Sequence, residues 1–320
     1  MTNKEQYIQF CQQHADICIY SQPWWLDAVV GDGWDVVLVW RDGRIVASFP
    51  YAIKHYPLGV NVIWMPHLTQ KLGPYIVYPP QMSEMKRIGF EHEIYSEIID
   101  HLPRFSQFIV NFDQRFKNWL AFYWRGFSQT TKYSYRLYGI KDHKAIIDGY
   151  NRHKVQKIRK AQGLTLKFDL DFNAFYSYIE DAISERGDKV EFSRELFVNL
   201  CRAIYSNNKG RILYCVDSND NIHAVDLVIW DGGVAYYLMA MRKKEYSTSG
   251  GTEFLVDETI KYASQYVDVF DFEGSMMPGV EEAYRWYGSS QTEYYCIYKN
   301  NSVLLSMYQN LKKALGRKRS

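Results

Sequence analysis

One ten-residue pattern occurs twice in the chain, as Ala121-Phe122-Tyr123-Trp124-Arg125-Gly126-Phe127-Ser128-Gln129-Thr130 and as Ala283-Tyr284-Arg285-Trp286-Tyr287-Gly288-Ser289-Ser290-Gln291-Thr292. The copies align without a gap, agree at six of ten positions and begin 162 residues apart, about half of the 320-residue chain. Each reads as the aromatic end of a helix, closed by a glycine and followed by a strand. A repeat at this spacing indicates a duplicated domain rather than one large fold.

The elements around the two copies are predicted in the same order. Both halves read strand, strand, strand, helix, strand, helix, strand, with Asp42-Gly43 supplying the first hairpin turn. The first half has strands at 36–40, 45–52, 61–65, 105–112 and 133–138, with helices at 91–102 and up to Gly126. The second half has strands at 211–216, 222–230, 234–241, 267–272 and 292–298, with helices at 252–265 and 280–287.

This order predicts two α/β (α+β) domains, each a mixed, mostly antiparallel sheet flanked by helices. We place them at residues 1–140 and 141–320, each long enough to bury a core. Helices across 142–161 and 171–185, with a strand at 164–168 between them, open the second domain. No proline-rich or serine-rich linker separates the halves, so we expect tightly packed domains.

Composition excludes several classes of protein. The net charge of +2, from 38 basic and 36 acidic residues, gives no global field for nucleic acid or membranes. The first residues lack the apolar core of a signal peptide and no segment is apolar enough to span a bilayer, so we expect a cytoplasmic protein. Five cysteines without a C-x-x-C pair and eight histidines without ligand spacing predict reduced thiols and no metal.

Several motifs together resemble two GNAT-type acyltransferase domains in tandem, as in the Fem-type peptidoglycan aminoacyltransferases. They are the helix end at 121–127, the segment Tyr236-Tyr237-Leu238 that leads to a glycine-containing loop and a helix, Asp271-Phe272-Glu273-Gly274, the basic helix at 152–161, and residues 182–187. The resemblance covers nearly the whole chain. The long helical hairpin that some Fem enzymes use near tRNA is missing, which leaves either acyl-CoA or aminoacyl-tRNA as co-substrate, neither tightly bound.

The second half contains a candidate donor loop. Arg242 begins a strand-to-helix connection that ends at Gly250, Gly251 and Thr252, where backbone N–H groups would point at a pyrophosphate. GNAT proteins hold coenzyme A with the equivalent loop, which this one matches loosely. The alternative is a helix entered by small capping residues.

The first half has prolines at the equivalent place, which remove N–H donors, so we expect no pyrophosphate there. In Fem-like proteins the first domain helps to bind the acceptor. The resemblance therefore suggests that Trp24, Trp25 and Lys71 line an acceptor groove. The alternative is buried aromatic packing beside a solvated lysine.

Three residues are candidates for catalysis. Asp271 and Glu273 alternate along a predicted strand and would share a face, where one can orient or deprotonate an amine. The alternative is a carboxylate that caps the following loop. Tyr284 occupies the place of the GNAT tyrosine that protonates the leaving thiolate, whereas the first copy has Phe122. Packing alone would also explain Tyr284.

Arg186 and Arg242 can hold an anionic acceptor by bidentate contacts, or remain solvated surface charges. The basic helix at 152–160 and the basic tail at 312–319 can contact tRNA or anionic lipid, although charge runs are usually soluble surface.

These residues favour an N-acyltransferase whose second domain is catalytic, acting on a small-molecule amine or a peptidoglycan precursor. The alternative function is a catalytically degenerate tandem-GNAT protein that binds a ligand or acts as a scaffold. Oligomeric state is not indicated by the sequence.

Overall fold

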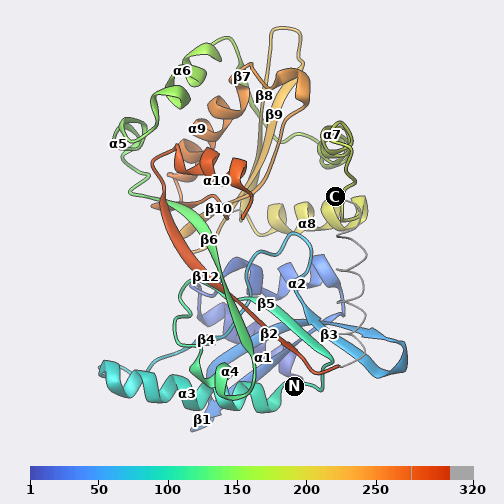
Figure 1. The fold of residues 1–320 in the computed structure, drawn as a ribbon, viewed down its shortest axis with the longest axis vertical. Coiled ribbons are helices and arrows are strands. Elements are labelled where there is room, and N and C mark those ends of the chain that lie inside the picture. Colours follow the sequence, from blue (N-terminus) through green and yellow to red (C-terminus); the bar gives the residue numbers. More distant parts are fainter. Residues whose placement is uncertain (275, 303–320) are drawn as a thin grey trace. The chain divides into compact units, whose positions relative to one another are not determined.

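The computed structural model describes residues 1–274 and 276–302, which form two compact units (Figure 1). The first unit comprises Met1–Thr131 together with the segment that begins at Tyr294, and the second comprises Lys132–Glu293. This division differs from a single boundary at residue 140. The C-terminal segment belongs to the first unit because its residues 296–300 pair with a strand of that unit.

The first unit is a sheet of mostly antiparallel strands packed with helices. Strands β1 and β2 form a hairpin, β3 follows antiparallel to β2, and β5 runs parallel to β3. Its strands are β1 (Trp34–Arg41), β2 (Arg44–Tyr56), β3 (Val60–Trp64), β4 (Tyr75–Ile76) and β5 (Gln107–Asn111). Its helices are α1 (Asn3–Gln13), α2 (Pro23–Val30), α3 (Glu84–His101) and α4 (Leu120–Trp124), with short 3-10 turns at Ile19–Ser21 and Pro57–Gly59.

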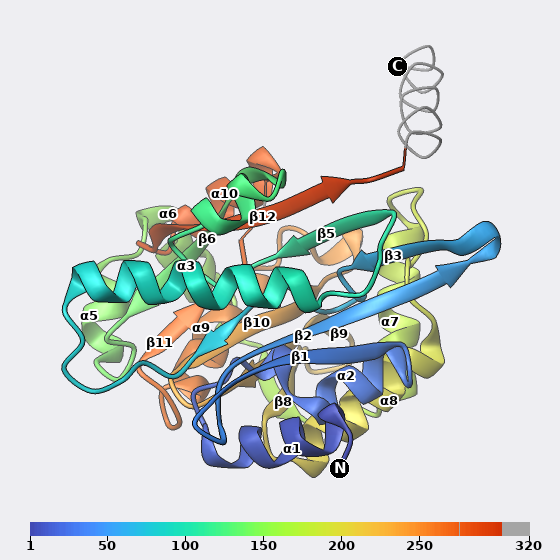
Figure 2. The same ribbon diagram turned by 90° about the horizontal axis from the view of Figure 1, so that it is seen from below.

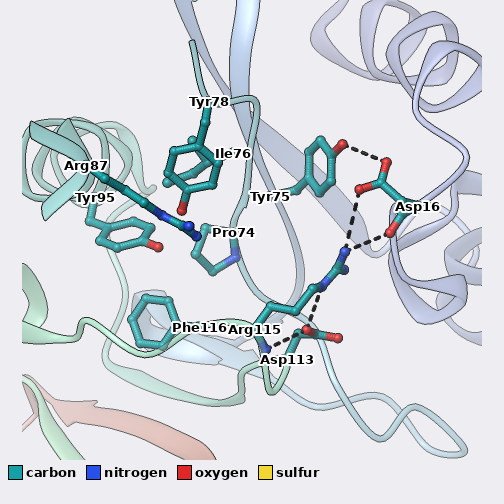
Figure 3. Close-up of a pocket in the computed structure, with 10 residues that line it drawn as sticks. All are labelled: Asp16, Pro74, Tyr75, Ile76, Tyr78, Arg87, Tyr95, Asp113, Arg115 and Phe116. Carbon is teal, nitrogen blue, oxygen red and sulfur yellow. Dashed lines mark hydrogen bonds and ion pairs between the residues drawn. The ribbon is translucent and has the colours of Figure 1, made fainter. Parts of the chain in front are cut away.

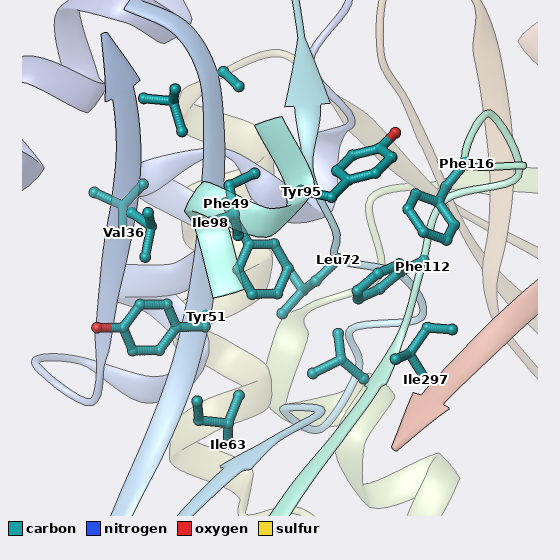
Figure 4. Close-up of a cluster of buried hydrophobic side chains, with 14 of the residues drawn as sticks. Val36, Phe49, Tyr51, Ile63, Leu72, Tyr95, Ile98, Phe112, Phe116 and Ile297 are labelled. Atoms are coloured by element: carbon teal, nitrogen blue, oxygen red, sulfur yellow. The ribbon is translucent and has the colours of Figure 1, made fainter. Parts of the chain in front are cut away.

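Aromatic rings fill the core of this unit (Figure 4). Phe112 lies at its centre, with ring centroids 4.7 Å from Phe116 and 5.2 Å from Phe122. Leu72 and Ile297 complete the cluster, although they come from positions 225 residues apart. A residue near the C-terminal end of the described chain therefore supports the N-terminal unit.

The second unit repeats the pattern. Strands β7 to β10 form an antiparallel series, and β11 is parallel to β10. These strands are β7 (Thr165–Phe168), β8 (Gly210–Val216), β9 (Ile222–Trp230), β10 (Val234–Met241) and β11 (Val269–Asp271). The helices are α5 (His143–Asp148), α6 (Arg152–Lys160), α7 (Phe172–Ser184), α8 (Arg194–Ser206), α9 (Gly251–Ala263) and α10 (Pro278–Arg285), with a 3-10 turn at Lys244–Tyr246.

Two differences from the sequence prediction concern helices. The single helix expected at 142–161 is broken, because Asn151 starts α6 with a side-chain cap on the N–H of His153 and gives its own N–H to the carbonyl of Trp286. Helix α8 was not predicted. Ser193 caps it, and its buried residues Phe197, Leu200, Cys201 and Ile204 recur at helical spacing.

The repeated ten-residue pattern closes α4 and α10 as expected. Gly126 and Gly288 follow these helices with φ of +75° and +73°, a conformation that glycine adopts without strain. The strands that follow are β6 (Ser128–Tyr138), green in Figure 1, and β12 (Ser290–Asn300), red. β6 starts in the first unit and ends in the second, while β12 does the reverse. Each copy of the repeat thus marks the place where the chain passes from one unit to the other.

Helix α3 packs against β1 and β2, and α9 packs against β8, β9 and α6. In Figure 2, α3 is seen along its length. These two helices occupy the same place in the two copies, because each precedes the strand that runs parallel to the antiparallel series: α3 comes before β5 and α9 before β11. In the second unit, α9 is therefore the helix that follows the predicted donor loop. Its counterpart in the first unit is α3.

Candidate active site

The second unit opens its sheet between β10 and β11. The parallel ladder covers only residues 234–236 and 269–271, and β10 then continues to Met241 with a bulge between Tyr237 and Met239. Beyond Asp271, the N–H of Phe272 bonds to the carbonyl of Tyr135 on β6 instead. The two strands therefore part after Tyr236 and Asp271, and residues beyond this point carry the candidate chemistry.

Tyr284 lies on α10 beside the place where the strands part. Its ring stacks on Phe272 with centroids 4.8 Å apart and planes 19° apart. Its hydroxyl has no hydrogen-bond partner among residues 1–274 and 276–302. Burial raises the pKa of Tyr284, and the nearby carboxyl groups of Glu273 and Asp226 raise it further. The hydroxyl is therefore protonated at neutral pH and can donate a proton.

Asp271 holds the loop that follows β11. Its buried carboxylate accepts hydrogen bonds from the hydroxyl of Ser134, from Nε of Arg136 at 2.9 Å and from the N–H of Glu273 at 2.8 Å. These donors fix the loop in the manner of a capping carboxylate. The geometry matches the loop-capping alternative of the sequence analysis.

Glu273 does not share a strand face with Asp271, so that prediction is wrong. β11 ends at Asp271, and Glu273 takes a left-handed conformation with φ of +64°, which breaks the alternation of side chains. Glu273 is nevertheless buried, and burial raises its pKa well above the ordinary value. Burial therefore favours the protonated form of Glu273, which cannot accept a proton from an amine.

A carboxylate that the sequence analysis missed, Asp226 on β9, lies in the core of the unit. Its Oδ1 accepts from the hydroxyl of Tyr237 at 2.7 Å and its Oδ2 from that of Thr259 at 3.1 Å. Burial raises the pKa of Asp226 to about 8. An acid within the apolar run from Ala224 to Val228 was the available signal.

The predicted donor loop is closely packed at its glycines. Gly250 has φ of +81°, and a Cβ there would lie 2.3 Å from the carbonyl oxygen of Lys157 on α6. The N–H of Gly251 bonds to Oγ of Ser249 at 3.1 Å. Oγ1 of Thr252 is buried with no hydrogen-bond partner among the described residues. The glycines thus allow α6 to approach the start of α9.

Most cations of the basic helix face this loop. Lys154 and Lys157 bond to Oε1 of Glu253 at 3.3 and 3.0 Å, and Lys160 bonds to the carbonyl of Thr248 at 2.8 Å. The basic tail at 312–319 lies outside the described residues. Arg152 and Arg159 are exposed, as are Lys157 and Lys160, and only Lys154 is buried.

The two predicted anion-binding arginines lie in different settings. Arg242 is half-buried near the end of β10, close enough to Lys154 for its charge to lower the pKa of that lysine, which burial already lowers. Arg186 is exposed after α7. Neither forms an ion pair with any residue that the structure describes.

The three first-unit residues are mostly buried. Trp25 is fully buried and donates its Nε1–H to Oγ1 of Thr69 at 3.0 Å, while Trp24 packs against it half-buried. Lys71 is also fully buried, with Nζ 3.3 Å from Oε1 of Gln114. The alternative interpretation of a solvated lysine is wrong, because the surrounding chain encloses Lys71.

Sequence reasoning also missed a cavity of about 350 Å³ in the first unit (Figure 3). Its walls include Asp16, Tyr75, Arg87, Asp113 and Arg115, from four separate segments of the chain. Burial opposes ionisation of Asp113, but the charges of Arg115 and Lys71 outweigh it and lower the pKa of this carboxyl. No local pattern in the sequence brings these segments together.

Residues 1–274 and 276–302 contain neither a helix suited to span a membrane nor a cluster of metal-ligating side chains. No helix there combines the length and apolar character needed to cross a membrane. Among the same residues, no group of three or more histidine, cysteine, aspartate or glutamate side chains could hold a metal ion.

Comparisons with known proteins agree with this architecture. Residues 150–286 match the family model of the acetyltransferase (GNAT) domain. FemX has a similar structure, with a TM-score of 0.68 and 12% identity over 97% of this chain and 98% of that one. A tandem GNAT protein from the clavulanic acid biosynthesis pathway has a TM-score of 0.51 and 10% identity, covering 94% and 95%.

L-PGS from Bacillus licheniformis is also similar, with a TM-score of 0.52 and 11% identity over 95% of this chain and 94% of that one. None of the curated proteins compared with the sequence matches it. At these identities the structural likeness shows the fold alone. The chain therefore contains a GNAT acetyltransferase domain at residues 150–286 and has a tandem GNAT fold like that of FemX.

Proposed function

We propose that the chain is an N-acyltransferase, in which the second unit transfers an acyl group from acyl-CoA to an amine. The observation that carries the proposal is Tyr284: a protonated phenol with no hydrogen-bond partner in the described chain, beside the parting of β10 and β11. The match of residues 150–286 to the acetyltransferase model supports the reaction class.

In the proposed reaction, the amine nitrogen attacks the thioester carbonyl, a C–N bond forms and the C–S bond breaks. Tyr284 gives its proton to the departing sulfur, and the amine loses a proton to solvent. In this proposal Asp271 and Glu273 are not the bases, because donors engage the first and burial favours the protonated form of the second. Asp271 holds the loop that follows β11, which positions Phe272 under Tyr284.

The proposed donor contacts come from the α9 loop. Arg242 and the buried hydroxyl of Thr252 are the groups there without a partner in the described chain, whereas Gly250 and Gly251 shape the backbone. Within the second unit, the exposed Arg186 is the proposed contact for an anionic acceptor. The acceptor is a small amine or a peptidoglycan precursor.

Replacing Tyr284 by phenylalanine is expected to lower kcat about 100-fold and to leave the melting temperature nearly unchanged, because it removes only an unpaired hydroxyl. The measurement is the steady-state rate of acyl transfer from acetyl-CoA to a panel of amines, with aminoacyl-tRNA as a second donor.

Tyr287→Phe is the matched control. Tyr287 also stacks on Phe272, at 5.3 Å, and its buried hydroxyl likewise has no partner among the described residues. It should keep the rate of the wild type. If Tyr284→Phe and Tyr287→Phe lose the same share of the transfer rate, Tyr284 has no specific role in the mechanism. If the wild type transfers only from aminoacyl-tRNA, acyl-CoA is not the donor.

The packed glycines favour a second candidate, a degenerate tandem-GNAT protein that binds a ligand without catalysis. A carbonyl fills the space beside Gly250 and a serine hydroxyl takes the N–H of Gly251. Coenzyme A that binds the native state must raise the melting temperature. No shift with coenzyme A, acetyl-CoA or charged tRNA, together with no transfer, would favour this second candidate.

A further inference from the structure

Two neighbouring cavities of the first unit share two arginines. The smaller, of about 350 Å³, is the one in Figure 3. The larger, of about 780 Å³, lies along the first turns of α3 and the approach to α4. Arg87 and Arg115 line both cavities. The two cavities therefore border each other at these two side chains.

Arg87 presents its two terminal guanidinium nitrogens at this junction, where the hydroxyl of Tyr78 is a hydrogen-bonding neighbour. Its side chain passes between the rings of Tyr78 and Tyr95 (Figure 3), with the guanidinium carbon 4.0 Å from the centroid of Tyr78. Only its Nε bonds to a carboxylate, Glu91, at 3.2 Å. In the described chain, its two terminal nitrogens bond to no carboxylate. These nitrogens suit a planar or tetrahedral oxyanion.

Two of the carboxylates that line these cavities, Glu91 and Asp113, are already engaged, whereas the exposed Glu84 also lines the larger cavity. Glu91 accepts from the hydroxyl of Tyr78 at 2.8 Å and from Nδ2 of Asn118 at 3.1 Å, in addition to Arg87. Asp113 accepts the backbone N–H and Nε of Arg115, each at 2.9 Å. Because protein donors engage Glu91 and Asp113, the terminal nitrogens of Arg87 are the place where an external anion would meet the least competition from these two carboxylates.

The larger cavity continues from these nitrogens of Arg87 along apolar side chains. Ile88, next to Arg87, is 45% exposed and Leu120 is 43% exposed, and Met82 and Trp119 lie beside them. Large apolar side chains gathered around one exposed groove indicate a binding surface. Lys117 adds a positive charge to its rim.

We propose that this groove binds an anionic amphiphile: a phosphate or carboxylate head group held by Arg87, with an alkyl chain along Ile88, Trp119 and Leu120. The inference concerns the first unit alone and does not depend on acyl transfer. The ligand is recognised by a charge at one end and apolar surface along the rest, so both features are tested separately.

The test is calorimetric titration of the full chain with hexyl, octyl and decyl phosphate below their micellar concentrations, and with inorganic phosphate. Affinity should rise with chain length, by up to about fourfold per methylene, because each buried methylene adds hydrophobic free energy. Inorganic phosphate should bind at least about tenfold more weakly than octyl phosphate, because it has no alkyl chain to bury in the groove.

Two pairs of neighbouring variants separate the contributions. Arg87→Gln should weaken octyl phosphate about tenfold, and Arg87→Lys by less, since it keeps the charge but loses the paired terminal nitrogens. Lys86→Gln removes the same charge from an exposed neighbour outside the cavities and should have little effect. Ile88→Ser should flatten the chain-length dependence, whereas Met85→Ser, exposed and outside the groove, should not.

Equal losses in Arg87→Gln and Lys86→Gln would overturn the head-group site, and affinity independent of chain length would overturn the groove. Vesicles of phosphatidylcholine with phosphatidic acid identify the source of the ligand. Binding to soluble octyl phosphate alone supports a free amphiphile, and binding to both supports a membrane lipid. Binding to vesicles alone, or to neither, contradicts the proposal.

Discussion

Replacing Gly274 by alanine is expected to destabilise the second unit by more than about 4 kcal/mol. Gly274 has φ of +68°, and a Cβ there would lie 2.0 Å from the carbonyl oxygen of Tyr133 and 2.6 Å from Cα of Ser134. Both are backbone atoms, so no side-chain rotation can relieve the contact. The loop after Asp271 would have to move away from β6. Urea unfolding followed by circular dichroism measures the loss.

Gly279→Ala provides the control a few residues away. Gly279 lies in the first turn of α10, and a Cβ there would meet no atom within 4 Å. Because alanine favours helix over glycine, this variant should be more stable than the wild type by up to about 1 kcal/mol. If Gly274→Ala unfolds at the same urea concentration as the wild type, the close approach to β6 does not exist.

The free energy of unfolding of Asp226→Asn should increase relative to that of the wild type as the pH rises. Folded Asp226 keeps its proton up to a pKa of about 8, whereas the unfolded chain releases it near 3.8. Between these values the unfolded state binds fewer protons, so the wild type loses stability as pH increases. From pH 5 to pH 8 the expected loss is about 4 kcal/mol relative to the variant. Urea unfolding at both pH values measures it.

Asp217→Asn is the comparison. Asp217 lies just before the same strand, β9, and its pKa is lowered where that of Asp226 is raised. Hydrogen bonds from the side chain and the N–H of Asn221 lower the pKa of Asp217 to about 2. Its contribution changes only in acid, so its stability difference from the wild type should stay constant between pH 5 and pH 8. A constant difference for Asp226→Asn as well would show that Asp226 is ionised in the folded protein.

The fold was largely predictable because local signals and the repeat agreed. Asp42 and Gly43 both take positive φ, at +49° and +74°, as the hairpin prediction required. The glycines of the repeat end their helices in the same conformation. The destination of β12 was not predictable, since strand periodicity gives the faces of a strand and not its neighbours.

The candidate site was predictable only in part. The place of Tyr284 in the repeat led to a position beside the parting strands, because helix length and glycine fix where that side chain lies. Alternation failed at Glu273 because one left-handed residue ends the strand pattern. The burial of Lys71 and the junction at Arg87 depend on segments far apart in the chain, which no local pattern describes.

Because β12 ends in the first unit, the two units become complete in a different order from that in which they are translated. Residues 132–293 emerge as one continuous stretch, so the second unit can assemble as soon as it has been translated. The first unit, although made earlier, lacks Ile297 and the strand beside β5 until the last described residues are released. The N-terminal half of this chain is therefore synthesised first and completed last.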